Sequence, residues 1–124
     1  MQPDQFHDRL DAARRRFASS LQRKIEDTVA ELPRLCGDSD KVIDAVEASY
    51  RRIHGICGVG ATVGFVVTGR AAKKAEDVMI GAFRGRRGLV AEELMRLEEA
   101  LEALSAAAAN ELRAIGAAAS AGET

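Results

Sequence analysis

The chain has 124 residues and a formal net charge of -1, with 47% hydrophobic and 30% charged residues, which suits one globular domain. Its basic clusters are flanked by acidic residues, so we expect no concentrated positive surface and no nucleic-acid partner. Two cysteines without disulfide spacing, no export signal and no apolar run of ~18 residues together predict a cytoplasmic protein without a membrane span.

Apolar residues recur every three or four positions over residues 6–32. This spacing predicts one long helix, or two helices joined at a pair of serines. Pro33 and Gly37 predict its end, because proline disfavours helix in the preceding residue and glycine suits a left-handed terminal position. Asp38 or Ser39 is then expected to cap the next helix.

The second predicted helix begins near Val42 and ends at Gly64. Its apolar residues, among them Val46, Tyr50 and Ile53, share one face at about 100° per residue, which places His54 beside that face rather than at its centre. On the histidine's own side, polar residues precede it and very small residues follow it: Glu47, Arg51, Gly55, Gly58, Ala61 and Thr62. We therefore expect His54 to have little side-chain bulk on one flank.

Several glycines lie close to this histidine, although glycine costs roughly 0.5–1 kcal/mol relative to alanine inside a helix. A bare surface beside His54 would explain their presence. Gly58, one turn after the histidine, is expected to leave that surface open. Gly55 and Gly60 suit either this role or close packing between helices, and both interpretations stay open.

Helical spacing resumes between Ala71 and Phe83 and continues from Leu89 to Ile115, with a predicted loop at residues 84–88. No segment alternates as a strand would. Amphipathic helices joined by short loops bury their apolar stripes against each other. We therefore predict an all-α fold, an up-down-up-down antiparallel four-helix bundle with an N-terminal helical extension. The bundle is expected to span residues 1–115 as a monomer, followed by a flexible C-terminal tail over residues 116–124.

The segment around His54 resembles the histidine-containing phosphotransfer (HPt) domain family. That family's motif has an aliphatic residue two positions after the histidine, glycine four and ten positions after it, and often a phenylalanine next. This chain has Ile56, Gly58, Gly64 and Phe65 at those places. The helical pattern from residue 4 to about 115 also matches the family's architecture.

The resemblance implies further site residues. Glu76 lies 22 positions after the histidine, where the family tends to place a residue that orients the ring. The family commonly has lysine or arginine three positions after the histidine, and this chain has Cys57 there. Arg51, Lys73 and Lys74 are candidates to replace that charge. The expected phosphate- and partner-binding face combines them with the small residues Gly58, Ala61 and Thr62.

In function, the resemblance implies two-component signal transduction. His54 would accept a phosphoryl group from the aspartate of a response-regulator receiver domain, or directly from a sensor histidine kinase, and pass it to another receiver. Such a phosphocarrier has histidine phosphotransferase activity but no ATP-dependent kinase activity, and it needs no cofactor because the receiver supplies Mg²⁺. The alternative is a helical adaptor that docks signalling partners without carrying phosphate. A nucleotide-binding glycine loop is disfavoured, since such a loop follows a strand.

Overall fold

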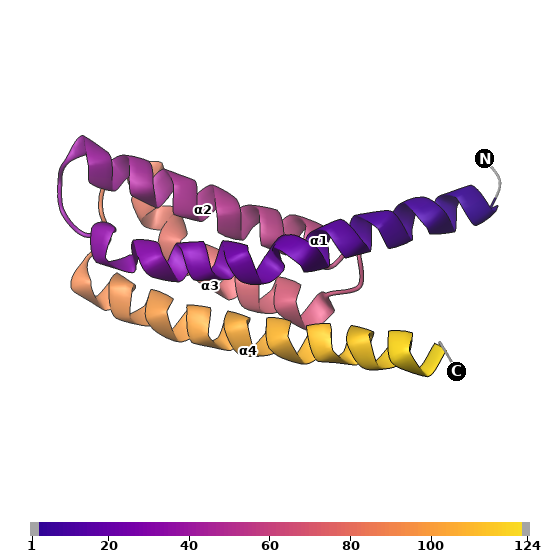
Figure 1. Ribbon diagram of the computed structural model, residues 1–124. Coiled ribbons are helices and arrows are strands. Elements are labelled where there is room, and N and C mark those ends of the chain that lie inside the picture. The colour runs from indigo at the N-terminus through magenta and orange to yellow at the C-terminus, as the bar shows by residue number, and fades with distance from the viewer. Residues whose placement is uncertain (1–2, 123–124) are drawn as a thin grey trace.

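The computed structural model describes residues 3–122, which contain four helices and no strand. The helices are α1 (Pro3–Glu31), α2 (Asp40–Gly60), α3 (Val66–Gly85) and α4 (Ala91–Gly122), with a 3₁₀ turn at Leu32–Arg34 after α1. Consecutive helices run in opposite directions (Figure 1). Because α1 packs on α2 and α4, and α3 packs on the same two helices, the contacts close into a ring. The predicted all-α four-helix bundle is confirmed.

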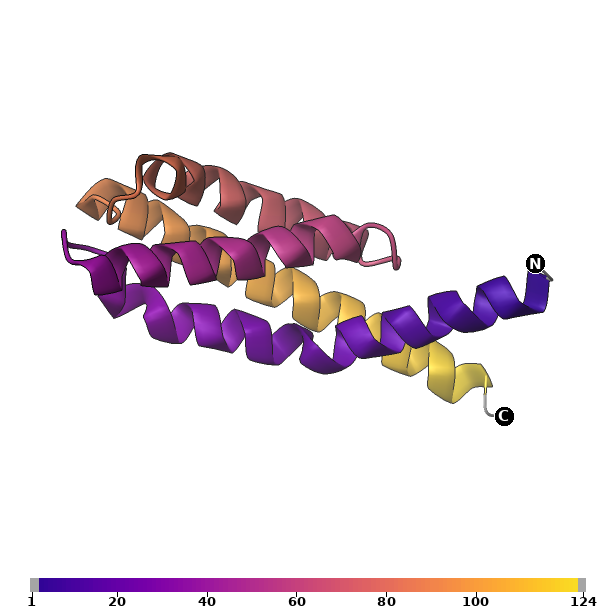
Figure 2. The same cartoon turned by 90° about the horizontal axis from the view of Figure 1, so that it is seen from above.

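Helix α1 is continuous, so the alternative of two joined helices is wrong. Ser19 and Ser20 donate their hydroxyl hydrogens to carbonyl oxygens of the preceding turn and leave the backbone helical. The first turns of α1 extend beyond the α2–α3 turn (Figure 2), where Phe6 is largely exposed. The predicted N-terminal extension is therefore part of α1 itself.

Leucine, isoleucine and small residues fill the centre of the bundle. Phe17 of α1 contacts Phe65 with 5.0 Å between ring centroids, which closes the core beside the α2–α3 turn. The largest fully buried side chains come from every helix: Leu21, Ile53, Ile56, Met79, Leu97, Leu101 and Leu104. No helix within residues 3–122 is long and apolar enough to span a bilayer.

The turn between α2 and α3 differs from the predicted one. Helix α2 ends at Gly60, four residues before Gly64, because the N–H of buried Phe65 donates to the carbonyl oxygen of Gly60 at 2.7 Å and turns the chain back. Gly64 has a left-handed φ of 93° within this turn. Helix α3 begins at Val66 rather than near residue 71, and Glu111 of α4 accepts a hydrogen bond from one of its first N–H groups.

The α3–α4 loop is also displaced, to residues 86–90, because α3 continues to Gly85. Helix α4 begins at Ala91, and the carboxylate of Glu93 accepts from the N–H of Val90 and from Arg87. These bonds hold the pKa of Glu93 below its usual value, Arg87 being the larger cause. Glu93 therefore helps to cap the N-terminus of α4, where the first backbone N–H groups have no partner within the helix.

Helix α4 continues to Gly122, whereas the sequence predicts its end near residue 115. The alanine-rich composition of this segment favours helix, because alanine has the highest intrinsic helix propensity. The flexibility of residues 116–124 stays a prediction, and residues 123–124 lie outside the described part of the chain.

Candidate functional site

His54 and Glu76 meet across the interface between α2 and α3. The ring nitrogen Nδ1 of His54 lies 3.1 Å from the carboxylate oxygen Oε2 of Glu76. The histidine side chain is 64% exposed, while the glutamate side chain is 7% exposed. One end of the pair therefore faces solvent, and the other is held inside the bundle.

The carboxylate of Glu76 determines the protonation pattern of the neutral ring. An ionised carboxylate only accepts hydrogen bonds, so Nδ1 carries the hydrogen and donates it to Glu76. The lone pair of the neutral imidazole is then on Nε2. An exposed ring with a free Nε2 lone pair is a nucleophile or a proton acceptor, and the buried glutamate maintains that state.

Lys73 is the second partner of the buried carboxylate. Its ammonium nitrogen lies 3.5 Å from Oε1 of Glu76 and 3.2 Å from Oδ1 of Asp77. The hydrogen bond and negative charge of Asp77, followed by the charge of Glu76, raise the pKa of Lys73 above its usual value. Of the three predicted basic residues, Lys73 thus has a direct contact to the partner of His54.

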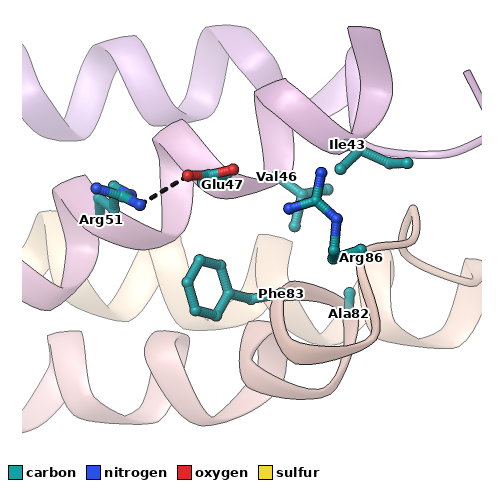
Figure 3. Close-up of a pocket in the computed structure, with 7 residues that line it drawn as sticks. All are labelled: Ile43, Val46, Glu47, Arg51, Ala82, Phe83 and Arg86. Carbon is teal, nitrogen blue, oxygen red and sulfur yellow. Dashed lines mark hydrogen bonds and ion pairs between the residues drawn. The ribbon is translucent and has the colours of Figure 1, made fainter. Parts of the chain in front are cut away.

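The other two basic residues have different neighbours. Arg51 donates to Glu47 on its own helix at 2.7 Å, and both line a pocket of about 160 Å³ between α2 and α3 (Figure 3). Phe83 and Arg86 line the same pocket from the α3 side. Lys74 lines a groove between α3 and α4 and has no hydrogen bond or ion pair to His54 or Glu76 among the described residues.

The glycines near His54 separate into two kinds. A Cβ atom added to Gly58 or Gly55 would have no neighbour within 4 Å, so both positions border open space. A Cβ atom on Gly60 would lie 3.3 Å from the carbonyl oxygen of Phe65 and 3.5 Å from Cα of Gly69. The packing interpretation is therefore confirmed for Gly60 and wrong for Gly55.

Ala61 and Thr62 are exposed, but they lie in the turn after α2 rather than on the helix itself. Helix α1 steadies this turn, because Nε of Arg14 donates to the carbonyl oxygen of Val63 at 2.8 Å. Ala61 and Thr62 therefore continue the exposed surface that begins at Gly58. They lie in a turn that the hydrogen bond from Arg14 holds against α1.

Cys57, at the place where the resembled family commonly has a basic residue, is half-buried. Burial, and then the nearby negative charge of Glu76, raise the pKa of its thiol above the usual value. The thiol is therefore neutral at physiological pH and fills space as a small apolar group. It contributes no charge to the site.

Tyr50 is a site residue that the sequence pattern assigned only to the buried stripe. Its ring is nearly parallel to that of His54, with an interplanar angle of 12° and 5.9 Å between centroids. The same tyrosine ring stacks on Phe83 of α3 at 4.0 Å and 14°. The spacing of four residues between Tyr50 and His54, one helical turn, was the available signal.

No three His, Cys, Asp or Glu side chains gather as metal ligands within the described part of the chain. No protein-family model, curated protein or solved structure matches this sequence.

Proposed function

We propose that this protein is a histidine phosphotransfer protein of a phosphorelay. His54 accepts a phosphoryl group from the aspartyl phosphate of a receiver domain and passes it to the aspartate of another receiver. The single observation that carries the proposal is the hydrogen bond from an exposed histidine Nδ1 to the buried carboxylate of Glu76. The motif around His54 adds the resemblance to the HPt family.

The burial of Glu76 supports a functional role for the pair. Carboxylates are seldom buried, because removing a charge from water is unfavourable unless the charge is paired. An apolar side chain of similar volume in place of the buried Glu76 would fill the same space between α2 and α3 without burying a charge. A site that needs an exposed nucleophile with one defined nitrogen lone pair gives a reason for keeping it.

The transfer step follows from this arrangement. The Nε2 lone pair of His54 attacks the phosphorus of the aspartyl phosphate, and the N–P bond forms as the P–O bond to the aspartate breaks. The aspartate of the receiver leaves as a carboxylate, whose charge a Mg²⁺ ion held by the receiver would neutralise. Because Nδ1 keeps its proton, the phosphorylated ring is positive, and the carboxylate of Glu76 stabilises that charge. The reverse step transfers the group to another receiver.

The surroundings of the ring suit an approaching protein. In-line transfer requires the donor oxygen, the phosphorus and Nε2 to align closely, so bulk beside the ring would prevent contact. Gly58 borders open space one turn after His54. Lys73 on the neighbouring helix contacts the same carboxylate and places a positive charge near the His54–Glu76 pair.

The proposal is tested by phosphoryl transfer in solution. A panel of receiver domains is labelled with ³²P from acetyl phosphate and Mg²⁺, separated from the donor, and mixed with the purified protein. We expect at least one receiver to label the chain with a bond that is stable in alkali and labile in acid, as a phosphoramidate is. A second, unlabelled receiver should remove the label. If the chain binds receivers but takes no label, the adaptor alternative replaces this proposal.

Replacing Glu76 with glutamine is expected to slow phosphoryl acceptance about tenfold. The amide oxygen still accepts from Nδ1, but a bond to a neutral group is weaker by about 1–1.5 kcal/mol than one to a carboxylate. The measurement is the initial rate of label transfer. Glu47→Gln removes a carboxylate from α2 whose only ion pair within residues 3–122 is with Arg51, and it serves as the matched control. Equal rates for both variants would contradict the role of Glu76.

Replacing Gly58 with glutamine is expected to slow transfer while slightly stabilising the bundle. The new side chain occupies the space beside His54, yet glutamine is a better helix former than glycine by about 0.5–1 kcal/mol. Gly116→Gln adds the same side chain to an open position on α4 and controls for the general effect. Transfer rates and thermal unfolding are measured for both. An unchanged rate for Gly58→Gln would mean that the receiver does not approach over this residue.

A further inference from the structure

We infer that Tyr50 is a positioning residue for His54, and that Phe83 completes a three-ring stack that holds the histidine ring against Glu76. The inference rests on the proposed function, since it concerns how the same imidazole is presented. It adds a second restraint to the hydrogen bond that defines the site.

The hydrogen bond alone leaves the ring incompletely fixed. It restrains Nδ1, but the ring can still swing about the line from Nδ1 to the carboxylate of Glu76. A histidine that is 64% exposed has few other neighbours to prevent this motion. The Tyr50 ring lies within 12° of parallel to the imidazole, with 5.9 Å between centroids, so it stands offset beside one face and limits the swing toward that side.

Tyr50 is itself held in place. Phe83 stacks against it with 4.0 Å between centroids, and the residue is half-buried at the α2–α3 interface. Helix α2 thus supplies His54 and Tyr50 one turn apart, and α3 supplies Glu76 and Phe83 two turns apart. The antiparallel helices bring them together as two neighbouring pairs, one polar and one aromatic.

A ring that is held at Nδ1 by Glu76 and flanked on one side by Tyr50 has few orientations, so its Nε2 lone pair points in a limited range of directions. The imidazole is then already oriented for attack before the receiver docks, and less conformational freedom of the ring is lost when the phosphorus approaches. Loss of the stack should therefore lower the rate of transfer without abolishing it.

The test uses the full chain with Tyr50→Phe, Tyr50→Leu and Phe83→Leu. In proton NMR spectra, the ring hydrogens of His54 should show an upfield ring-current shift in wild type and Tyr50→Phe that is lost in Tyr50→Leu. Transfer should fall about three- to tenfold in Tyr50→Leu, fall less in Phe83→Leu, and be preserved in Tyr50→Phe. Rescue by phenylalanine separates stacking from any role of the hydroxyl, and urea midpoints report the stability change of each variant.

The outcomes distinguish the inference from the function. If wild type accepts label and Tyr50→Leu accepts it at the same rate, the positioning role is overturned and the phosphotransfer proposal stands. If wild type takes no label from any receiver, the proposed function is lost, and an unchanged His54 shift in Tyr50→Leu would separately overturn the stack. A Tyr50→Phe variant as slow as Tyr50→Leu would also overturn it.

Discussion

Replacing His54 with glutamine is expected to abolish acceptance of the phosphoryl group completely. Glutamine keeps a polar side chain on the exposed face of α2 but has no nitrogen lone pair that attacks phosphorus. Because the histidine side chain is largely exposed, the bundle should keep its helix content and nearly all of its stability. The measurement is ³²P label transferred from a phosphorylated receiver, with circular dichroism to check the fold.

The chain offers a matched control in His7, the only other histidine. His7 lies exposed on the first turns of α1, far along the sequence from the α2–α3 site. His7→Gln should accept label at the wild-type rate. Label retained by His54→Gln and lost from His7→Gln would move the phosphorylation site to α1 and remove His54 from the mechanism.

Replacing Gly88 with alanine is expected to lower the free energy of unfolding by roughly 2 kcal/mol and the melting temperature by roughly 8 °C. Gly88 is buried in the α3–α4 loop, where an added Cβ would overlap the carbonyl oxygen of Gly37 and lie 2.8 Å from its nitrogen. The next residue, Leu89, donates its N–H to the carbonyl oxygen of Leu35 at 2.7 Å. The methyl group would force apart two loops that this bond joins.

Gly55→Ala is the control for this substitution. It places the same methyl group where nothing lies within 4 Å, in the middle of α2. Its expected effect is a gain of about 0.5–1 kcal/mol, because alanine is the better helix former. Thermal and urea unfolding of both variants measure the difference. A Gly88→Ala protein as stable as wild type would show that the two loops do not approach so closely.

The fold could be predicted from periodicity because burial along a helix repeats with the helix itself. The leucines of α4 illustrate this, since Leu97, Leu101 and Leu104 follow the predicted stripe and are all buried. The ends of the helices were predicted less well. Gly64 was expected to end α2, but the helix ends at Gly60. The chain turns there because Phe65 must reach the core, and the sequence around residue 60 does not show where the core lies.

The candidate site was predictable only in part. His54 was expected beside the apolar face from its angular position, and it is exposed as that geometry requires. Its pairing with Glu76 was expected from the family resemblance alone, since a separation of 22 positions along the chain does not by itself bring two residues together. Lys73 and Lys74 are adjacent in sequence, yet only Lys73 contacts Glu76, because successive residues of a helix point about 100° apart.

The sequence by itself determined the four amphipathic helices, the exposed side of His54 and the open flank at Gly58, because each depends on residue spacing within one helix. The tertiary structure decided which side chains meet between helices: Glu76 with the histidine edge, Phe83 with Tyr50, and Gly60 with Gly69. Such meetings depend on the register and closeness of α2 and α3. That register is set by the packing of the whole core and is therefore not contained in the periodicity of either helix.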